Sequence, residues 1–158
     1  MTISSTTVKN SYSGDGTTDT FNYTFKIFAD TDLQVIIRSS TATETVKTLT
    51  THYTVTGAGN ANGGTVVFTA GNIPTATETV VLRRAIPQTQ AIDYIANDPF
   101  PAESHEEGLD RSMMAIQQLQ EEVNRTIKFS KTNDFNSNAE DAGTFTVGQT
   151  TRSGKILA

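Results

Sequence analysis

Apolar and polar residues alternate in the first half of the chain with the period of two that is typical of β-strands. The clearest stretch covers residues 21–27, where aromatic and aliphatic residues occupy every second position. This alternation predicts a strand with one aromatic face in a core. Further strands are predicted over residues 33–37, 43–49, 52–55, 65–68 and 79–83. Short strands with no helical pattern between them indicate an antiparallel β-sandwich or small barrel.

The apolar positions change to a helical period from Glu103 to about Phe129. They follow alternating spacings of four and three, which form the seam of a left-handed coiled coil. The predicted seam consists of Leu109, Met113, Ile116, Gln120, Val123 and Ile127. Ser104 and Glu107 stand in capping-box register, so they predict the helix start.

Two interpretations of this apolar stripe remain open. A single amphipathic helix packed on its own sandwich would show much the same periodicity. We favour an oligomeric coil, because the polar Gln120 occupies a seam position, as residues that fix register and oligomer number do. A helix of about 27 residues would also be about 40 Å long, which is long beside so small a core.

The predicted fold class is therefore mainly β with one long helix. We expect a β-sandwich head over residues 1–86, a proline-containing connector over 87–102, and a stalk helix over 103–131. Residues 132–158 are expected to form a linker and the start of a further β element, a short β-rich stub at the carboxyl end. We also expect the chain to be the amino-terminal part of a longer protein.

The composition of the chain argues against several classes of function. The 158 residues carry a net charge of −5, which argues against a nucleic-acid-binding protein, since such proteins need a basic face. Apolar runs are too short for membrane insertion, and the amino terminus lacks the features of a signal peptide. The absence of cysteine excludes disulfides and cysteine catalysis.

Candidate chemistry is sparse. The two histidines, His52 and His105, have no further ligands at metal-site spacing. The glycine-rich segment 57–64 precedes a predicted strand and lacks the lysine of a phosphate-binding loop, so a hairpin connection explains it better. The carboxylates near Glu103 fit the positive end of the helix dipole. We therefore predict no catalytic residue, no metal site and no cofactor.

Several motifs together resemble the amino-terminal domain of tail-fibre and tailspike proteins of short-tailed bacteriophages. The resemblance covers about residues 8–131. It is carried by Tyr53-Thr54-Val55, Val66-Val67-Phe68, Leu82-Arg83-Arg84, Pro87-Gln88-Thr89-Gln90, Asp93-Tyr94, Phe100-Pro101-Ala102-Glu103, Glu107, Leu109-Asp110-Arg111 and the run Gln117–Glu122. Gly108 departs from it, because similar sequences tend to carry a better helix former there.

The residues of this chain predict that it is not an enzyme. The resemblance implies a homotrimeric virion protein of the phage tail, assembled in the host cytoplasm, with host recognition or polysaccharide depolymerisation located further towards the carboxyl end. Its amino-terminal domain would anchor a fibre or tailspike to the tail or an adaptor protein. The host receptor would be contacted only by parts of the full protein beyond residue 158.

Interface chemistry suggests where an adaptor would dock, because arginine and aromatic residues are typical interface anchors. The candidates are Arg83, Arg84, Gln90, Tyr94 and Phe100. The alternative function is a carbohydrate-binding or adhesin-type β-sandwich. The absence of tryptophan argues against it.

Overall fold

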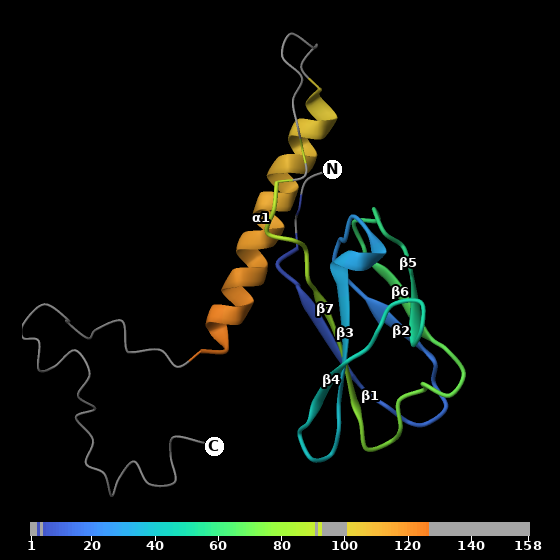
Figure 1. Cartoon of the computed structure of the whole chain (residues 1–158). Coiled ribbons are helices and arrows are strands. Elements are labelled where there is room, and N and C mark those ends of the chain that lie inside the picture. Colours follow the sequence, from blue (N-terminus) through green and yellow to red (C-terminus); the bar gives the residue numbers. More distant parts are fainter. Residues whose placement is uncertain (1–2, 4, 91, 93–100, 127–158) are drawn as a thin grey trace, which may run out of the picture. The chain divides into compact units, whose positions relative to one another are not determined.

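The computed structural model describes residues 3, 5–90, 92 and 101–126. Two antiparallel sheets and one long helix are found among these residues (Figure 1), which confirms the predicted mainly β class. The predicted carboxyl-terminal stub and most of the connector lie outside the described residues. The described residues up to Arg125 form one compact unit.

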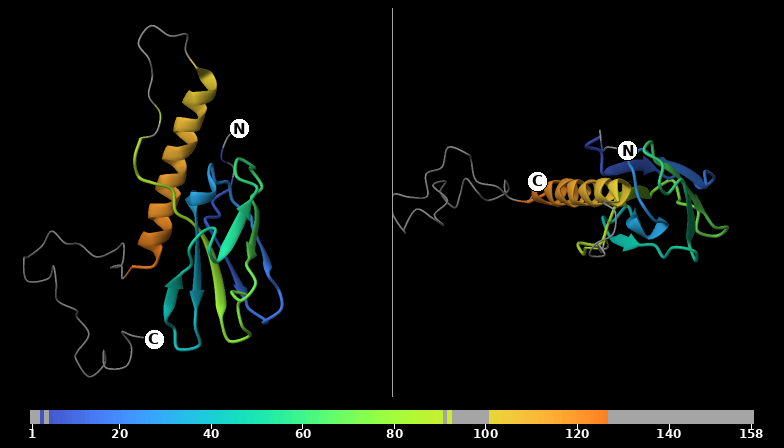
Figure 2. Two further views of the ribbon diagram at one scale, coloured as in Figure 1. Left: turned by 45° about the vertical axis from the view of Figure 1, so that its right-hand side comes forward. Right: turned by 90° about the horizontal axis from the view of Figure 1, so that it is seen from above.

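The first sheet has the order β1-β7-β3-β4 and the second the order β2-β6-β5, and every pair in both is antiparallel (Figure 2). The first sheet comprises β1 (Lys9–Ser13), β7 (Thr79–Arg84), β3 (Leu33–Arg38) and β4 (Glu44–Val46). The second comprises β2 (Thr20–Tyr23), β6 (Gly64–Phe68) and β5 (Tyr53–Thr56). A short 3₁₀ turn, η1 (Asp30–Asp32), precedes β3.

One hydrophobic core lies between the sheets, because both contribute alternate side chains to it. Phe21 and Tyr23 of β2 meet Val35 of β3 and Leu82 of β7 in this cluster. Phe25 and Ile27 are also buried, yet β2 ends at Tyr23. The strand predicted over 21–27 is therefore shorter than expected.

β2 ends where its partner strand does, because Tyr23 pairs with Gly64, the first residue of β6, and Gly63 before it has a positive φ of 84°. The next backbone N–H, that of Thr24, donates to the side chain of Asn10, to Oδ1 at 3.0 Å. Asn10 belongs to β1, a polar edge strand that the alternation did not predict. Its five residues pair with β7 from Lys9↔Arg83 to Ser13↔Thr79.

Helix α1 covers Ala102–Asn124, with Pro101 rather than Ser104 at its N-cap. The first intrahelical bond runs from His105 N to Pro101 O at 3.0 Å. The Ser104 cap prediction is wrong because Ala102 and Glu103 are strong helix formers that extend the helix upstream. Arg125 is the C-cap, so α1 also ends before the predicted Phe129.

Candidate interaction site

Helix α1 turns a largely polar face towards the β-sandwich. Its buried residues are Asp110, Met114 and Gln118. Lys26 Nζ donates to Asp110 Oδ2 at 2.9 Å, and the backbone N–H of Ile3 donates to Asp110 Oδ1 at 3.2 Å. This ion pair is well shielded from solvent, since the side chains are 12% and 6% exposed.

Arg84 is the central contact of this face. It ends β7 and is only 1% exposed, so this docking candidate is buried in the single chain. Its Nη2 donates to Gln117 Oε1 at 2.6 Å and to the carbonyl oxygen of Met114 at 3.4 Å. Burial lowers the pKa of the Arg84 guanidinium to about 10. A large cation is thus enclosed between sheet and helix.

Glutamine side chains complete the helix contact. Gln118 Oε1 accepts the backbone N–H of Ile86 at 3.0 Å, immediately beyond β7. Gln117 Nε2 donates to the carbonyl oxygen of Ser5 at 3.0 Å. Because glutamine satisfies backbone groups that no strand partner reaches, these two residues fix the helix to two separate segments of the head.

Aromatic stacking adds a contact near the helix start. The Arg111 guanidinium lies 4.2 Å from the centroid of the Phe28 ring, and Lys26 Nζ lies 4.6 Å from it. Arg111 also pairs with Glu107 at 2.8 Å. Two cations, each paired with a helix carboxylate, therefore contact the Phe28 ring.

Exposed ion pairs form the rim of the contact. Arg83 Nη2 lies 2.6 Å from Glu122 Oε1. Glu121 Oε1 receives Lys9 Nζ at 3.2 Å and Arg125 Nε at 3.0 Å. Burial alone would raise the pKa of the Glu121 carboxyl, but the hydrogen bonds from Lys9 and Arg125 lower it below its ordinary value.

The lowered pKa of Glu121 predicts a loss of stability in acid. A carboxyl whose folded-state pKa is depressed stabilises the fold above its unfolded pKa, here 4.5, and loses that contribution as the pH falls through the folded value. Glu121→Gln should therefore reduce stability at neutral pH by about 1 kcal/mol or less and flatten the acid dependence. Urea unfolding at neutral pH and at about pH 3 measures both effects. An unchanged acid dependence in the variant would contradict this assignment.

The opposite side of α1 exposes the predicted seam. Leu109 is 61% exposed, Met113 47%, Ile116 60% and Val123 41%. Gln120 is exposed and its amide donates to Asn124 Oδ1 at 3.0 Å, while Ile127 lies outside the described residues. The helix does pack on its own sandwich, but through its polar face. The periodicity alone missed this division of the helix into a polar contact and an exposed apolar face.

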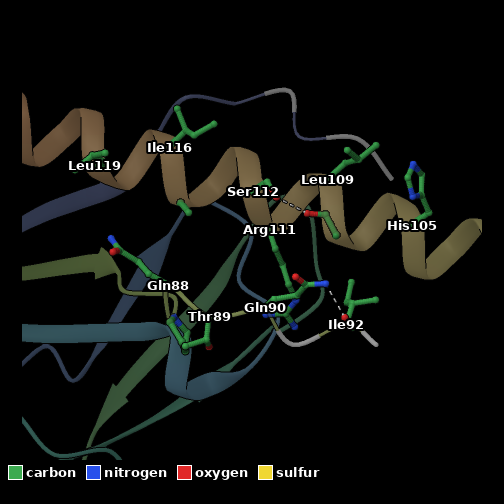
Figure 3. A pocket seen from close by; sticks show the side chains of 13 residues that line it. Gln88, Thr89, Gln90, Ile92, His105, Leu109, Arg111, Ser112, Ile116 and Leu119 are labelled. Atoms are coloured by element: carbon green, nitrogen blue, oxygen red, sulfur yellow. Dashed lines mark hydrogen bonds between the residues drawn. The ribbon is translucent and has the colours of Figure 1, made fainter. Parts of the chain in front are cut away.

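A groove of about 600 Å³ flanks the exposed face (Figure 3). One wall is the connector, through Pro87, Gln88, Thr89, Gln90 and Ile92, and the other is α1. The helix contributes His105, Gly108, Leu109, Arg111, Ser112, Ala115, Ile116 and Leu119.

The predicted docking residues are placed differently from one another. Gln90 is exposed at the groove, where its amide donates to the carbonyl oxygen of Ile92 at 3.0 Å. Arg83 is partly exposed in the rim pair with Glu122. Tyr94 and Phe100 lie outside the described residues. Of the three described candidates, Arg83 and Gln90 are accessible to solvent and Arg84 is buried.

Other candidate chemistry has structural explanations. Among the described residues, no group of three or more His, Asp or Glu side chains is placed to hold a metal ion. His52 Nδ1 accepts the backbone N–H of Thr48 at 2.9 Å and so serves a turn. Within that same part of the chain, no helix combines the length and apolar character needed to cross a bilayer.

Comparison with known proteins agrees with the sequence motifs. No family model matches the chain. Over 122 residues, 75% of its length, it is 40% identical to the tail spike protein of Salmonella phage epsilon15, a short-tailed phage. The matched stretch spans 11% of that relative's length. The predicted resemblance is thereby confirmed: over three quarters of its length, this chain is related to a tail spike protein of a short-tailed bacteriophage.

Proposed function

We propose that this chain is the attachment module of a phage tail spike or tail fibre. Three copies would join through α1 and hold the spike to the tail or to an adaptor protein. The observation that carries the proposal is the exposed apolar face of α1. The 40% identity between this chain and a tail spike protein supports a structural role in the phage tail.

Water contact with so regular an apolar stripe costs free energy, so the stripe needs a cover. The head does not supply it, because Arg84, Lys26 and Ile86 bind the polar face instead. Another copy of the same helix fits best, since residues spaced four and three apart pack into the matching spaces of an identical helix.

The residue types favour more than two copies. In heptad notation, Met113 and Gln120 take position a, while Leu109, Ile116 and Val123 take position d. Parallel dimers prefer leucine at d, whereas β-branched residues at d shift the preference towards trimers or tetramers. Ile116 and Val123 are both β-branched, and a trimer agrees with the resemblance to tailspike proteins.

The proposed mechanism is mechanical and multivalent. Three aligned chains would present three copies of whatever lies further along the protein, which raises avidity without any new contact. The match covers 11% of the tail spike relative, and we assign host recognition or enzymatic activity to regions outside this chain. Of the described docking candidates, Arg83 and Gln90 have accessible side chains in the single chain, and Arg83 stays clear of the groove between helix and connector.

Sedimentation equilibrium tests the assembly directly. The 158-residue chain should sediment at about three times 17.0 kDa and dissociate on dilution, because the seam is short. A monomer at concentrations of about 10 µM and above would contradict the trimer.

Competition during particle assembly tests the anchor. Excess free chain should occupy the attachment sites and yield spike-poor, poorly infectious particles. A glycan array serves as the control for the alternative adhesin function, and we expect no specific glycan binding. Normal spike occupancy together with glycan binding would contradict the anchor function and support the adhesin function.

A further inference from the structure

The exposed face of α1 is bordered on one side by the beginning of the chain. We call Ile3 and residues 5–7 the amino-terminal arm. Ile3 N donates to Asp110 Oδ1 at 3.2 Å, and Ser5 O accepts from Gln117 Nε2 at 3.0 Å. Asp110 and Gln117 lie seven residues apart, so the arm follows one side of the helix.

The connector groove borders the other side of the same face. Its helix wall includes His105, Ser112 and Leu119, which also repeat every seven residues. Gly108 and Ala115 lie between them and leave the groove open, because they carry little or no side chain. The opposite wall offers Gln88 and Gln90, whose amides can bind an extended backbone.

The seam assigns these two borders to specific heptad positions. With Met113 at a and Ile116 at d, Asp110 and Gln117 fall at e, while His105, Ser112 and Leu119 fall at g. In a parallel coil, the g side of each helix faces the e side of its neighbour. The groove of one copy therefore faces the amino-terminal arm of the next.

We propose that the amino-terminal arm of each copy occupies the connector groove of the neighbouring copy. The inference rests on the proposed trimer. It adds that the helices are parallel and that the arm and the groove form a second contact beside the seam. The Ile3 side chain is only partly buried in its own chain and would meet the groove near His105 and Leu109. The arm's backbone would bind the amides of Gln88 and Gln90. Each groove is incomplete until a second copy supplies its arm.

The pairing predicts which residues meet. A g residue contacts the following e position of the neighbour, so Ser112 lies beside Gln117 of the neighbouring copy. Gln117 holds Ser5 of its own arm, which brings Ser5 of one copy near Ser112 of the next. Both serines are exposed, and the chain contains no cysteine, so an engineered pair reports on this contact alone.

The test is disulfide cross-linking of the variant Ser5→Cys with Ser112→Cys in the full chain. Oxidation should link copies in a ring and give covalent trimers on non-reducing gels, since a disulfide requires Cα atoms about 4.4–6.8 Å apart. The two single variants and the pair Ser5→Cys with Ser104→Cys are controls. Ser104 takes position f on the head side, so these controls should give no covalent trimer.

Sedimentation of the same reduced samples separates the two proposals. Non-covalent trimers that fail to cross-link, or that link only within one chain, overturn the arm–groove contact while the proposed trimer stands. Reduced variants that are monomeric, while the parent chain is a trimer, overturn the claim that exposed serines can be changed without disturbing assembly. A monomeric parent chain removes both proposals.

Discussion

Replacing Ile116 with Asp should convert the proposed trimer into a folded monomer. Ile116 is 60% exposed in the single chain but central in the seam. Assembly would bury three aspartates against one another, and an uncompensated buried charge costs about 3–5 kcal/mol. The head should keep its strand-type circular dichroism, because Ile116 belongs to the face of α1 that turns away from the sandwich. Sedimentation and circular dichroism on the same sample measure both outcomes.

Val46→Asp is the matched control. Val46 is 56% exposed but lies on β4, away from α1, so this change should leave the mass unaltered and shift stability by about 0.5 kcal/mol or less. Loss of the trimer in both variants would point to a general solubility effect. Global unfolding of Ile116→Asp alone would show that the head depends on this helix face for its own folding.

Arg84→Ala should lower the free energy of unfolding by about 3–5 kcal/mol, because it opens a cavity between β7 and α1. It also removes the donor that Gln117 Oε1 accepts from and the additional contact with the Met114 carbonyl. The adjacent Arg83→Ala is the control, since it removes only the rim ion pair with Glu122 and should cost less than about 1 kcal/mol. Urea unfolding followed by circular dichroism measures both.

The contrast between the two arginines is decisive for the role of Arg84. Equal, small losses would show that docking of the helix does not depend on the buried guanidinium. If Arg84→Ala instead left stability intact and abolished binding to the tail, Arg84 would be a docking residue after all.

The faces of the strongly alternating strands could be predicted from the sequence. In β2 and β3, every second residue is large and apolar. Burial of that face determines which side chains point into the core and therefore the register of the strand. β1 escaped prediction because Lys9, Asn10 and Ser11 carry no apolar alternation. It forms because all five of its residues pair with β7 through backbone hydrogen bonds. Backbone pairing cannot be predicted from the hydrophobicity of side chains.

The helix shows a different limit of sequence analysis. Its period identified which residues share a face but not which face meets the head. Packing of the apolar stripe on the head remained one of two interpretations, and association with other copies was favoured. The sandwich instead presents Lys26 and Arg84, whose partners Asp110 and Gln117 lie on the neighbouring face. A long-range pairing of this kind has no signature in local periodicity.

The spacing of the polar contacts along α1 has a mechanical consequence. From Asp110 to Glu122 they extend over about 18 Å of helix axis, and they attach to Lys26, Arg84, Ile86 and Arg83 of the head. A pull along the helix therefore loads these bonds together in shear instead of peeling them one after another. Tension applied at the carboxyl end of α1 is therefore transmitted to β7, an inner strand of the four-stranded sheet. The connector carries little of this load.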